Sequence, residues 1–186
     1  MVGDIMDDLN QKVIKELPGQ RRFSVMGENT FLIANKLMNN RKICRLLKYQ
    51  TRDPFLDIDP VTGKAQPDVD GAELINKQIL IVPKVFDDST EKMSYIVSVF
   101  DDFVVNQLNP EFKLTTLRFD IACPYDEWLL NHTSLRPYLI MEEIDKMFNE
   151  GKLKGIGTLQ FYRADNLTLS PWIGGYSMRY KINEFN

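Results

Sequence analysis

The fold is decided by residues 135–185, which read LRPYLIMEEIDKMFNEGKLKGIGTLQFYRADNLTLSPWIGGYSMRYKINEF. The first part predicts an amphipathic helix over residues 135–149, because apolar side chains recur at intervals of three and four. The side chains expected to face a core are Leu135, Tyr138, Leu139, Met141, Ile144, Met147 and Phe148. Pro137 fits the first helical turn, and Ser134 is the expected amino-terminal cap.

Two strands are predicted after this helix. Gly151 and Gly155 are expected to end the helix, and the apolar pattern then predicts strands over residues 156–163 and 176–182. The last strand alternates strictly, with Tyr176, Met178, Tyr180 and Ile182 facing in and Ser177, Arg179, Lys181 and Asn183 facing out. The stretch therefore predicts a sheet that is covered by a helix.

The chain before residue 135 predicts further helices and strands. Helical spacing covers residues 4–17 and 28–49, and Asn39 and Asn40 are expected to divide the second region. Strands are predicted over residues 79–85, 93–103 and 112–123, with a bulge at Thr116 and Leu117. This order predicts one α+β domain over residues 1–186, with a mainly antiparallel or mixed sheet of about five strands flanked by helices.

Residues 51–78 are predicted to form a long loop, since prolines and glycines recur there and no apolar period persists. Loops of this length inside a domain are usually functional or disordered, so the loop is a candidate contact surface. Its carboxylates are Asp53, Asp57, Asp59, Asp68 and Asp70. They do not follow the ligand spacing of a twelve-residue calcium loop, and solvated charge is favoured over a metal site.

Composition narrows the classes of function. A net charge of −3 and a pI near 5.3 disfavour specific nucleic-acid binding, which usually requires a basic surface. No apolar run is long enough for a membrane span, and no signal peptide is recognisable, so we expect no membrane partner and cytosol-like conditions. Cys44 and Cys123 lack a metal-binding pattern and are interpreted as buried free thiols.

Candidate chemical motifs are weak. The stretch from Gly151 to Gly157 follows a helix instead of preceding one, which disfavours a phosphate loop. Asp68, Glu111 and Lys113 imitate the PD-ExK arrangement of metal-dependent nucleases, although Asp68 lies in an irregular loop. His132, the single histidine, is interpreted as an exposed turn residue. We therefore expect no catalytic residue, no metal and no cofactor.

Several segments together resemble the neck proteins of tailed bacteriophages. They are LLKY at 46–49, RDP at 52–54, ILIVPK at 79–84, RPYLI at 136–140, GIG at 155–157 and GGY at 174–176. The closest family is the tail terminator, also called the tail-completion or head–tail joining protein. The likeness extends over about residues 28–185.

This resemblance implies a structural, non-enzymatic virion protein. Members form a six-membered ring on the last tail-tube ring, end growth of the tube and meet the head connector. The expected partners are other copies of the chain in a homohexamer, the tail-tube protein and the head connector or adaptor protein. The expected location is the neck of the virion, after assembly in the host cytoplasm. The resemblance implies no catalytic residues.

A ring of this kind requires two complementary patches on each subunit. The candidate interface residues are Asp57, Asp59, Asp70, Trp172, Arg179 and Lys181. Trp172 can equally contact a partner or pack on its own sheet. Two alternative functions remain open, namely a small metal-dependent nuclease of the PD-ExK kind and another phage head-completion or baseplate adaptor protein.

Overall fold

The computed structural model describes residues 22–85, 91–105, 113–131, 133–154 and 156–183. The helix predicted over residues 4–17 lies outside these ranges, as does His132. The helices are α2 (Arg22–Met38), α3 (Arg41–Lys48) and α4 (Arg136–Phe148), with the 3-10 turns η1 (Gly71–Leu74) and η2 (Tyr125–Glu127). The strands are β1 (Ile79–Leu80), β2 (Tyr95–Val105), β3 (Lys113–Pro124), β4 (Lys152–Leu153), β5 (Gly157–Thr168) and β6 (Ile173–Asn183).

The strands form one mixed sheet in the order β1-β2-β3-β6-β5-β4. β1 and β2 are parallel, and the other neighbouring pairs are antiparallel. The α+β class is therefore confirmed. The sheet has six strands and not five, because β4 is a two-residue strand, too short to produce a period of two in the sequence.

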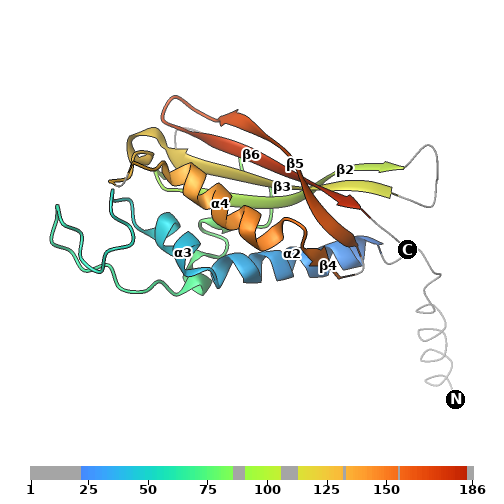
Figure 1. The fold of residues 1–186 in the computed structure, drawn as a ribbon, viewed down its shortest axis with the longest axis horizontal. Helices are drawn as coiled ribbons and strands as arrows, with labels where there is room; N and C mark the ends of the chain where they lie inside the picture. Colours follow the sequence, from blue (N-terminus) through green and yellow to red (C-terminus); the bar gives the residue numbers. More distant parts are fainter. Residues whose placement is uncertain (1–21, 86–90, 106–112, 132, 155, 184–186) are drawn as a thin grey trace, which may run out of the picture.

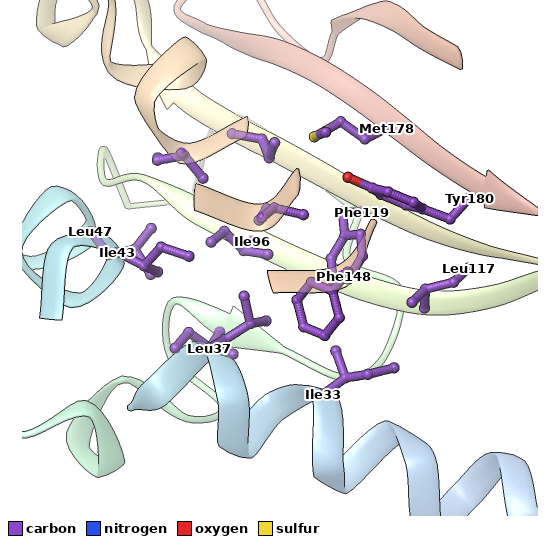
Figure 2. Packing of buried hydrophobic residues seen from close by; sticks show 14 of the residues in the cluster. Ile33, Leu37, Ile43, Leu47, Ile96, Leu117, Phe119, Phe148, Met178 and Tyr180 are labelled. Atoms are coloured by element: carbon purple, nitrogen blue, oxygen red, sulfur yellow. The ribbon is translucent and has the colours of Figure 1, made fainter. Parts of the chain in front are cut away.

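The main core lies between the sheet and the helices (Figures 1 and 2). Ile33 and Leu37 from α2 and Phe148 from α4 meet strand side chains such as Phe119 and Tyr180. The Phe119 ring lies 5.0 Å from that of Phe148 and edge-on to Tyr180 at 5.9 Å, distances typical of favourable aromatic pairs. The helices therefore enclose the main core together with one face of the sheet.

The break between α2 and α3 occurs where the asparagines predict it. Asn40 adopts an extended conformation, and its side-chain oxygen accepts the backbone N–H of Ile43 at 3.1 Å. This is the hydrogen bond that an amino-terminal cap supplies to an otherwise unpaired helical donor. The predicted division of residues 28–49 into two helices is confirmed.

Two details of the predicted strands are wrong. The strand predicted over residues 79–85 ends at Leu80, and Pro83 in the remainder has no N–H for a ladder. The bulge lies in β2 between Asp101 and Val104, opposite the third strand instead of within it. Asp102 takes a φ of 54°, which a short Asp side chain accepts more easily than the β-branched Thr116.

The inward face of α4 also differs from the prediction. Arg136, Pro137 and Ile140 are buried together with Ile144 and Phe148, whereas Tyr138 is exposed. The residue at the cap position is Leu135, whose side chain makes no capping hydrogen bond, so Ser134 is not the cap. The helix begins one residue later, and the apolar stripe is rotated so that an arginine faces inward.

The glycine pair of β6 permits close approach of the neighbouring strands. A Cβ atom on Gly175 would overlap the carbonyl oxygen of Ile121 on β3. A Cβ atom on Gly174 would overlap the ring of Tyr125. Because β3 lies between β2 and β6 in the sheet, it cannot move away from Gly175 without disturbing its pairing with β2, whereas the exposed Tyr125 side chain beside Gly174 can move.

Replacing Gly175 by Ala should destabilise the fold by about 1–3 kcal/mol, as overpacking of a core typically does. Gly27→Ala in α2 is the matched control, because a Cβ there contacts nothing within 4 Å and alanine favours the helix by about 0.5–1 kcal/mol. Urea unfolding of both variants measures the effect. Equal stability of the two variants would contradict the close approach of β3 and β6.

Candidate functional site

Residues 51–70 form an irregular segment, here called the arm, which projects beyond the end of the sheet (Figure 1). Four apolar side chains on it are exposed, namely Phe55, Leu56, Ile58 and Val61. The last two are 59% and 84% exposed. Exposed apolar side chains gathered on one projecting segment indicate a contact surface more strongly than the same residues scattered singly.

Arg45 of α3 holds the arm in its shape. Its side chain is 2% exposed and donates to the carbonyl oxygens of Pro54 at 2.8 Å, Leu56 at 2.6 Å and Gln66 at 2.9 Å. It also pairs with Asp68 at 3.2 Å. A guanidinium group offers five donors in a fixed plane, so one side chain can join both legs of an irregular loop.

Asp59 closes the tip of the arm. Its carboxylate accepts hydrogen bonds from the Thr62 hydroxyl and from the backbone N–H of Val61 at 3.1 Å. These bonds, the Thr62 bond first, hold the pKa of Asp59 below its usual value. The side chain is 4% exposed, and Gly63 completes the turn with a φ of 67°. The structure therefore places Asp59 inside the arm, as part of its turn.

The other two acidic candidates lie at different places on the arm. The Asp57 side chain is 88% exposed, with its carboxylate 3.9 Å from Nη2 of Arg45. Asp70 lies at the base of the arm, where its carboxylate accepts the backbone N–H of Ala72 at 2.9 Å and begins η1. Of the three, Asp57 is the carboxylate best placed to meet a partner beside the apolar side chains.

The base of the arm is attached to the body by Arg136, which is fully buried. Its guanidinium donates to the carbonyl oxygens of Leu46, of Tyr49 at 2.9 Å and of Thr51 at 2.6 Å. A fourth hydrogen bond, 3.0 Å long, reaches the carbonyl of Glu127. One α4 side chain thus satisfies the carbonyls at the end of α3 and at the start of the arm.

A second surface is the face of the sheet that no described helix covers. Arg118 pairs there with Asp101 and, at 3.2 Å, with Asp120, and Arg179 lies 3.4 Å from Asp102. Lys181 lies over the Tyr162 ring at 3.7 Å. Arg179 and Lys181 therefore lie on one face, as predicted from the alternation of β6, and belong to a surface of mixed charge.

Trp172 packs at one end of this same face. It is half-buried against a small cluster formed by strand residues, which are Leu80, Tyr95, Val97, Ala122 and Ile173. Lys92 approaches the indole ring at 5.8 Å. The structure thus brings Trp172, Arg179 and Lys181 to one face of the sheet, while the acidic candidates belong to the arm.

Asp68, the first residue of the candidate nuclease motif, is paired with two arginines. Its carboxylate contacts Arg41 at 2.7 Å and Arg45, and the Arg41 hydrogen bond lowers the pKa of Asp68. Glu111 lies outside the described residues, and Lys113 begins β3. Within the described ranges, no three His, Cys, Asp or Glu side chains cluster closely enough to hold a metal ion.

Comparison with known families adds one finding. The family model YomW matches residues 40–182, which is more than half of the chain. The chain belongs to the YomW family. This family is phage-associated. No curated protein matched the chain. The match spans both surfaces of this YomW protein, from Asn40 at the start of α3 to Ile182 in β6.

The sequence prediction missed the two arginines that organise this YomW protein. Arg45 lies between Ile43, Cys44, Leu46 and Leu47, all of which are buried. Arg136 directly precedes a proline at the start of a helix. An arginine inside an apolar stripe indicates a buried guanidinium, since an unpaired charge there would be costly. That pattern could have identified Arg45, although not the carbonyls that it binds.

Arg45→Met should loosen the arm while the sheet remains folded, because three carbonyl oxygens lose their donor. The amide of Gln66, which donates to Asp57 O at 2.7 Å, should then exchange with solvent about tenfold faster or more. Arg41→Met is the control, since Arg41 is exposed and makes one pair with Asp68. Unchanged exchange in the Arg45 variant would contradict its role in the arm.

Glu127 should make stability depend on pH. Burial raises the pKa of Glu127 to about 7. The positive charge of nearby Arg136 acts in the opposite direction, but its effect on this pKa is smaller. In the unfolded chain Glu127 loses this proton near the ordinary glutamate pKa of 4.5, whereas in the folded chain it retains the proton until about pH 7. Stability should therefore fall as pH rises between these values and then level off.

Urea midpoints at about pH 5 and about pH 8 measure this effect. In Glu127→Gln the decrease in stability between the two conditions should be smaller than in the unchanged protein. Glu73→Gln, which changes an exposed carboxylate, serves as the charge-matched control. The same decrease in all three proteins would show that Glu127 does not cause it.

Proposed function

We propose that this protein is a structural component of the phage neck, which caps the tail tube, ends its polymerisation and joins the tail to the head connector. It acts as a ring of six copies in the virion, assembled in the host cytoplasm. Membership of a phage-associated family and the resemblance to tail terminators support this proposal. The observation that carries it is the arm, an irregular segment held rigidly by Arg45 with its apolar side chains exposed.

Rigidity of the arm matters for binding. A flexible loop loses conformational entropy when it binds, and this loss opposes association. The hydrogen bonds from Arg45 and the turn at Asp59 order the arm before any partner arrives. Ile58 and Val61 are then free to be buried against a partner such as the tail-tube protein or the head connector.

The mixed-charge face of the sheet complements this role. Its arginines and aspartates pair with one another, so the face carries alternating charge. Such a surface contributes more to orientation and choice of partner than to affinity. An apolar arm and a charged face give the subunit two chemically different patches, which suits contacts with unlike partners such as the tail-tube protein and the head connector.

The nuclease alternative has less support. Asp68, its first carboxylate, is engaged by Arg41 and Arg45, and these two cations would oppose a divalent metal at the same oxygen atoms. If Asp68→Asn abolished a metal-stimulated cleavage of DNA by the purified protein, the nuclease function would be supported instead. A head-completion or baseplate adaptor would use the same two surfaces and differ in its location on the particle.

Electron microscopy tests the proposed location. Purified protein is mixed with tail tubes and with DNA-filled heads of the phage that encodes it, and we expect it at the head-proximal end of the tube. Binding at the baseplate end or at heads alone would contradict the tail-terminator role.

The arm should be required for this docking. The double variant Ile58→Ser with Val61→Ser should fold normally, because both side chains are exposed, and should bind tube ends at least about tenfold more weakly. Phe31→Ser, which removes an exposed apolar side chain from α2, is the control. Equal binding by all three proteins would remove the arm from the docking surface.

A further inference from the structure

An open groove lies between α4 and the strands β5 and β6, on the face of the sheet that the helices cover. Its volume is about 310 Å³. Four apolar or aromatic side chains and two carboxylates line it, namely Tyr138, Met141, Phe161, Met178, Glu142 and Asp145. Tyr138 and Phe161 are both exposed. The groove is therefore a largely apolar surface that no described element covers.

The α4 wall of this groove has the spacing of a helix-packing stripe. Tyr138, Met141, Glu142 and Asp145 stand at i, i+3, i+4 and i+7, so they lie on one side of the helix. The sequence predicts that Tyr138 and Met141 face a core, yet Tyr138 is exposed and Met141 is half-buried. α4 thus offers an uncovered side to a further element.

The strand wall of the groove is also uncovered. On the helix-facing side of the sheet, Ala164 of β5 pairs with Met178 of β6, and Asn166 pairs with Tyr176. Ala164 and Asn166 are exposed, whereas Met178 is buried. The helices therefore cover β6 and stop short of β5. The small side chain of Ala164 permits another backbone to approach closely.

Residues 4–17, which precede α2 and lie outside the described ranges, carry a complementary stripe. The sequence predicts a helix there with apolar side chains on one side. They are Ile5, Met6, Leu9, Val13 and Leu17. A helix over these residues is about 21 Å long, close to the length of about 20 Å for α4. Since short isolated helices are only marginally stable in water, the stripe needs a surface to pack on.

The first half of α2 lies at the end of the molecule where the groove also ends. There the Asn29 side chain donates to the carbonyl oxygen of Lys154 at 2.9 Å, directly after β4 (Figure 1). The side chain of Asn149, directly after α4, accepts the backbone N–H of Phe161 at 3.0 Å. The first half of α2, the end of α4 and the groove residue Phe161 are therefore found at the same end.

The chain is long enough to return from α2 to the groove. Five peptide units join Leu17 to Arg22 and span up to about 17 Å. Pro18 and Gly19 within this stretch are residues that turns favour, and they separate the predicted helix from α2. A turn there would lay residues 4–17 along α4 and parallel to it, with Leu17 near the end of α4.

The charges of the segment and of the groove match in this direction. Lys12 borders the apolar stripe of the predicted helix. With Leu17 near the end of α4, Lys12 would come level with Glu142 and Asp145, the two carboxylates of the groove. Opposite charges beside an apolar contact contribute more to its register than to its strength.

We infer that residues 4–17 form an amphipathic helix that docks in the groove of the same chain, with Leu9 and Val13 against Met141 and Phe161. The docked helix extends the helix layer across β5 and buries a surface that would otherwise remain an exposed apolar patch. Its apolar side chains act as anchors in the way that amphipathic helices bind grooves of other proteins. This contact does not depend on the proposed neck role.

Limited digestion with trypsin tests the docking, because cleavage after Lys12 requires the segment to leave the groove. Met141→Ser removes an apolar side chain from the groove and leaves the segment unchanged. Cleavage after Lys12 should be at least about tenfold faster in this variant than in the unchanged protein. Val61→Ser is the matched control, since Val61 is exposed on the arm and outside the groove. Equal cleavage of all three proteins, whether slow or fast, overturns the inference.

A second pair of variants changes the segment itself, so that the test does not depend on how well Met141→Ser folds. Leu9→Ser should accelerate cleavage after Lys12, whereas Gln11→Ser, on the opposite side of the predicted helix, should not. Leu9→Ser combined with Met141→Ser should accelerate cleavage no further than the faster single variant, because both remove the same contact. Effects that multiply would show that the two side chains do not meet, and the inference would fail.

Cross-linking identifies whose groove the segment occupies. Leu9→Cys with Met141→Cys, treated with a short bismaleimide, should give a cross-linked monomer on a denaturing gel. Gln11→Cys with Met141→Cys is the control and should react more slowly. The native cysteines are both buried. A cross-linked dimer would place the segment in the groove of a second copy, and equal reaction of the two pairs would show no docking; either result overturns the inference.

Discussion

Buried backbone carbonyls that no helix or strand uses must still find donors, and two arginine side chains meet this requirement here. Arg45 serves both legs of the arm, and Arg136 serves the end of α3 and the base of the arm. Without these guanidinium groups, the irregular chain from Thr51 to Asp70 could not lie against α3 without leaving buried carbonyls unsatisfied. The arm, and hence the main candidate contact surface, depends on them.

The same hydrogen bonds connect the arm to the body of the protein. Arg45 and Leu46 are adjacent, and Leu46 contributes its side chain to the core while its carbonyl accepts from Arg136. Arg136 belongs to α4, whose Ile144 and Phe148 pack on the sheet. The position of the arm is therefore set by the helix layer that covers the core. No described helix is long and apolar enough to cross a bilayer.

The two faces of the sheet carry different chemistry. The face under the helices is apolar and continuous with the main core, as Figure 2 shows. The other face combines a small apolar cluster near Trp172 with the paired charges around Arg118 and Arg179. Because the described helices cover one face only, the second face is accessible to a partner. This distribution is consistent with the neck role proposed above.

Local pattern was sufficient to predict much of the fold. The period of two in β6 predicted its inward Met178, Tyr180 and Ile182, and Asn40 predicted the division of α2 from α3, because these features depend on residues close in sequence. The outward placement of Arg179 and Lys181 follows from the same alternation. The prolines and glycines predict a loop over residues 51–78, and the structure has irregular chain up to Asp70 followed by the 3-10 turn η1 within that range.

Only the tertiary structure decided where several charged side chains lie and what they bind. The sequence does not say that Arg45 and Arg136 turn inward, because the carbonyls that accept their hydrogen bonds are fixed by packing of the arm, α3 and α4. Asp57 and Asp59 look alike in the sequence, yet Asp59 closes a turn and Asp57 is exposed. By itself the sequence determined the elements and their faces through local periodicity. The roles of its charged residues were determined by non-local contacts, which no local pattern encodes.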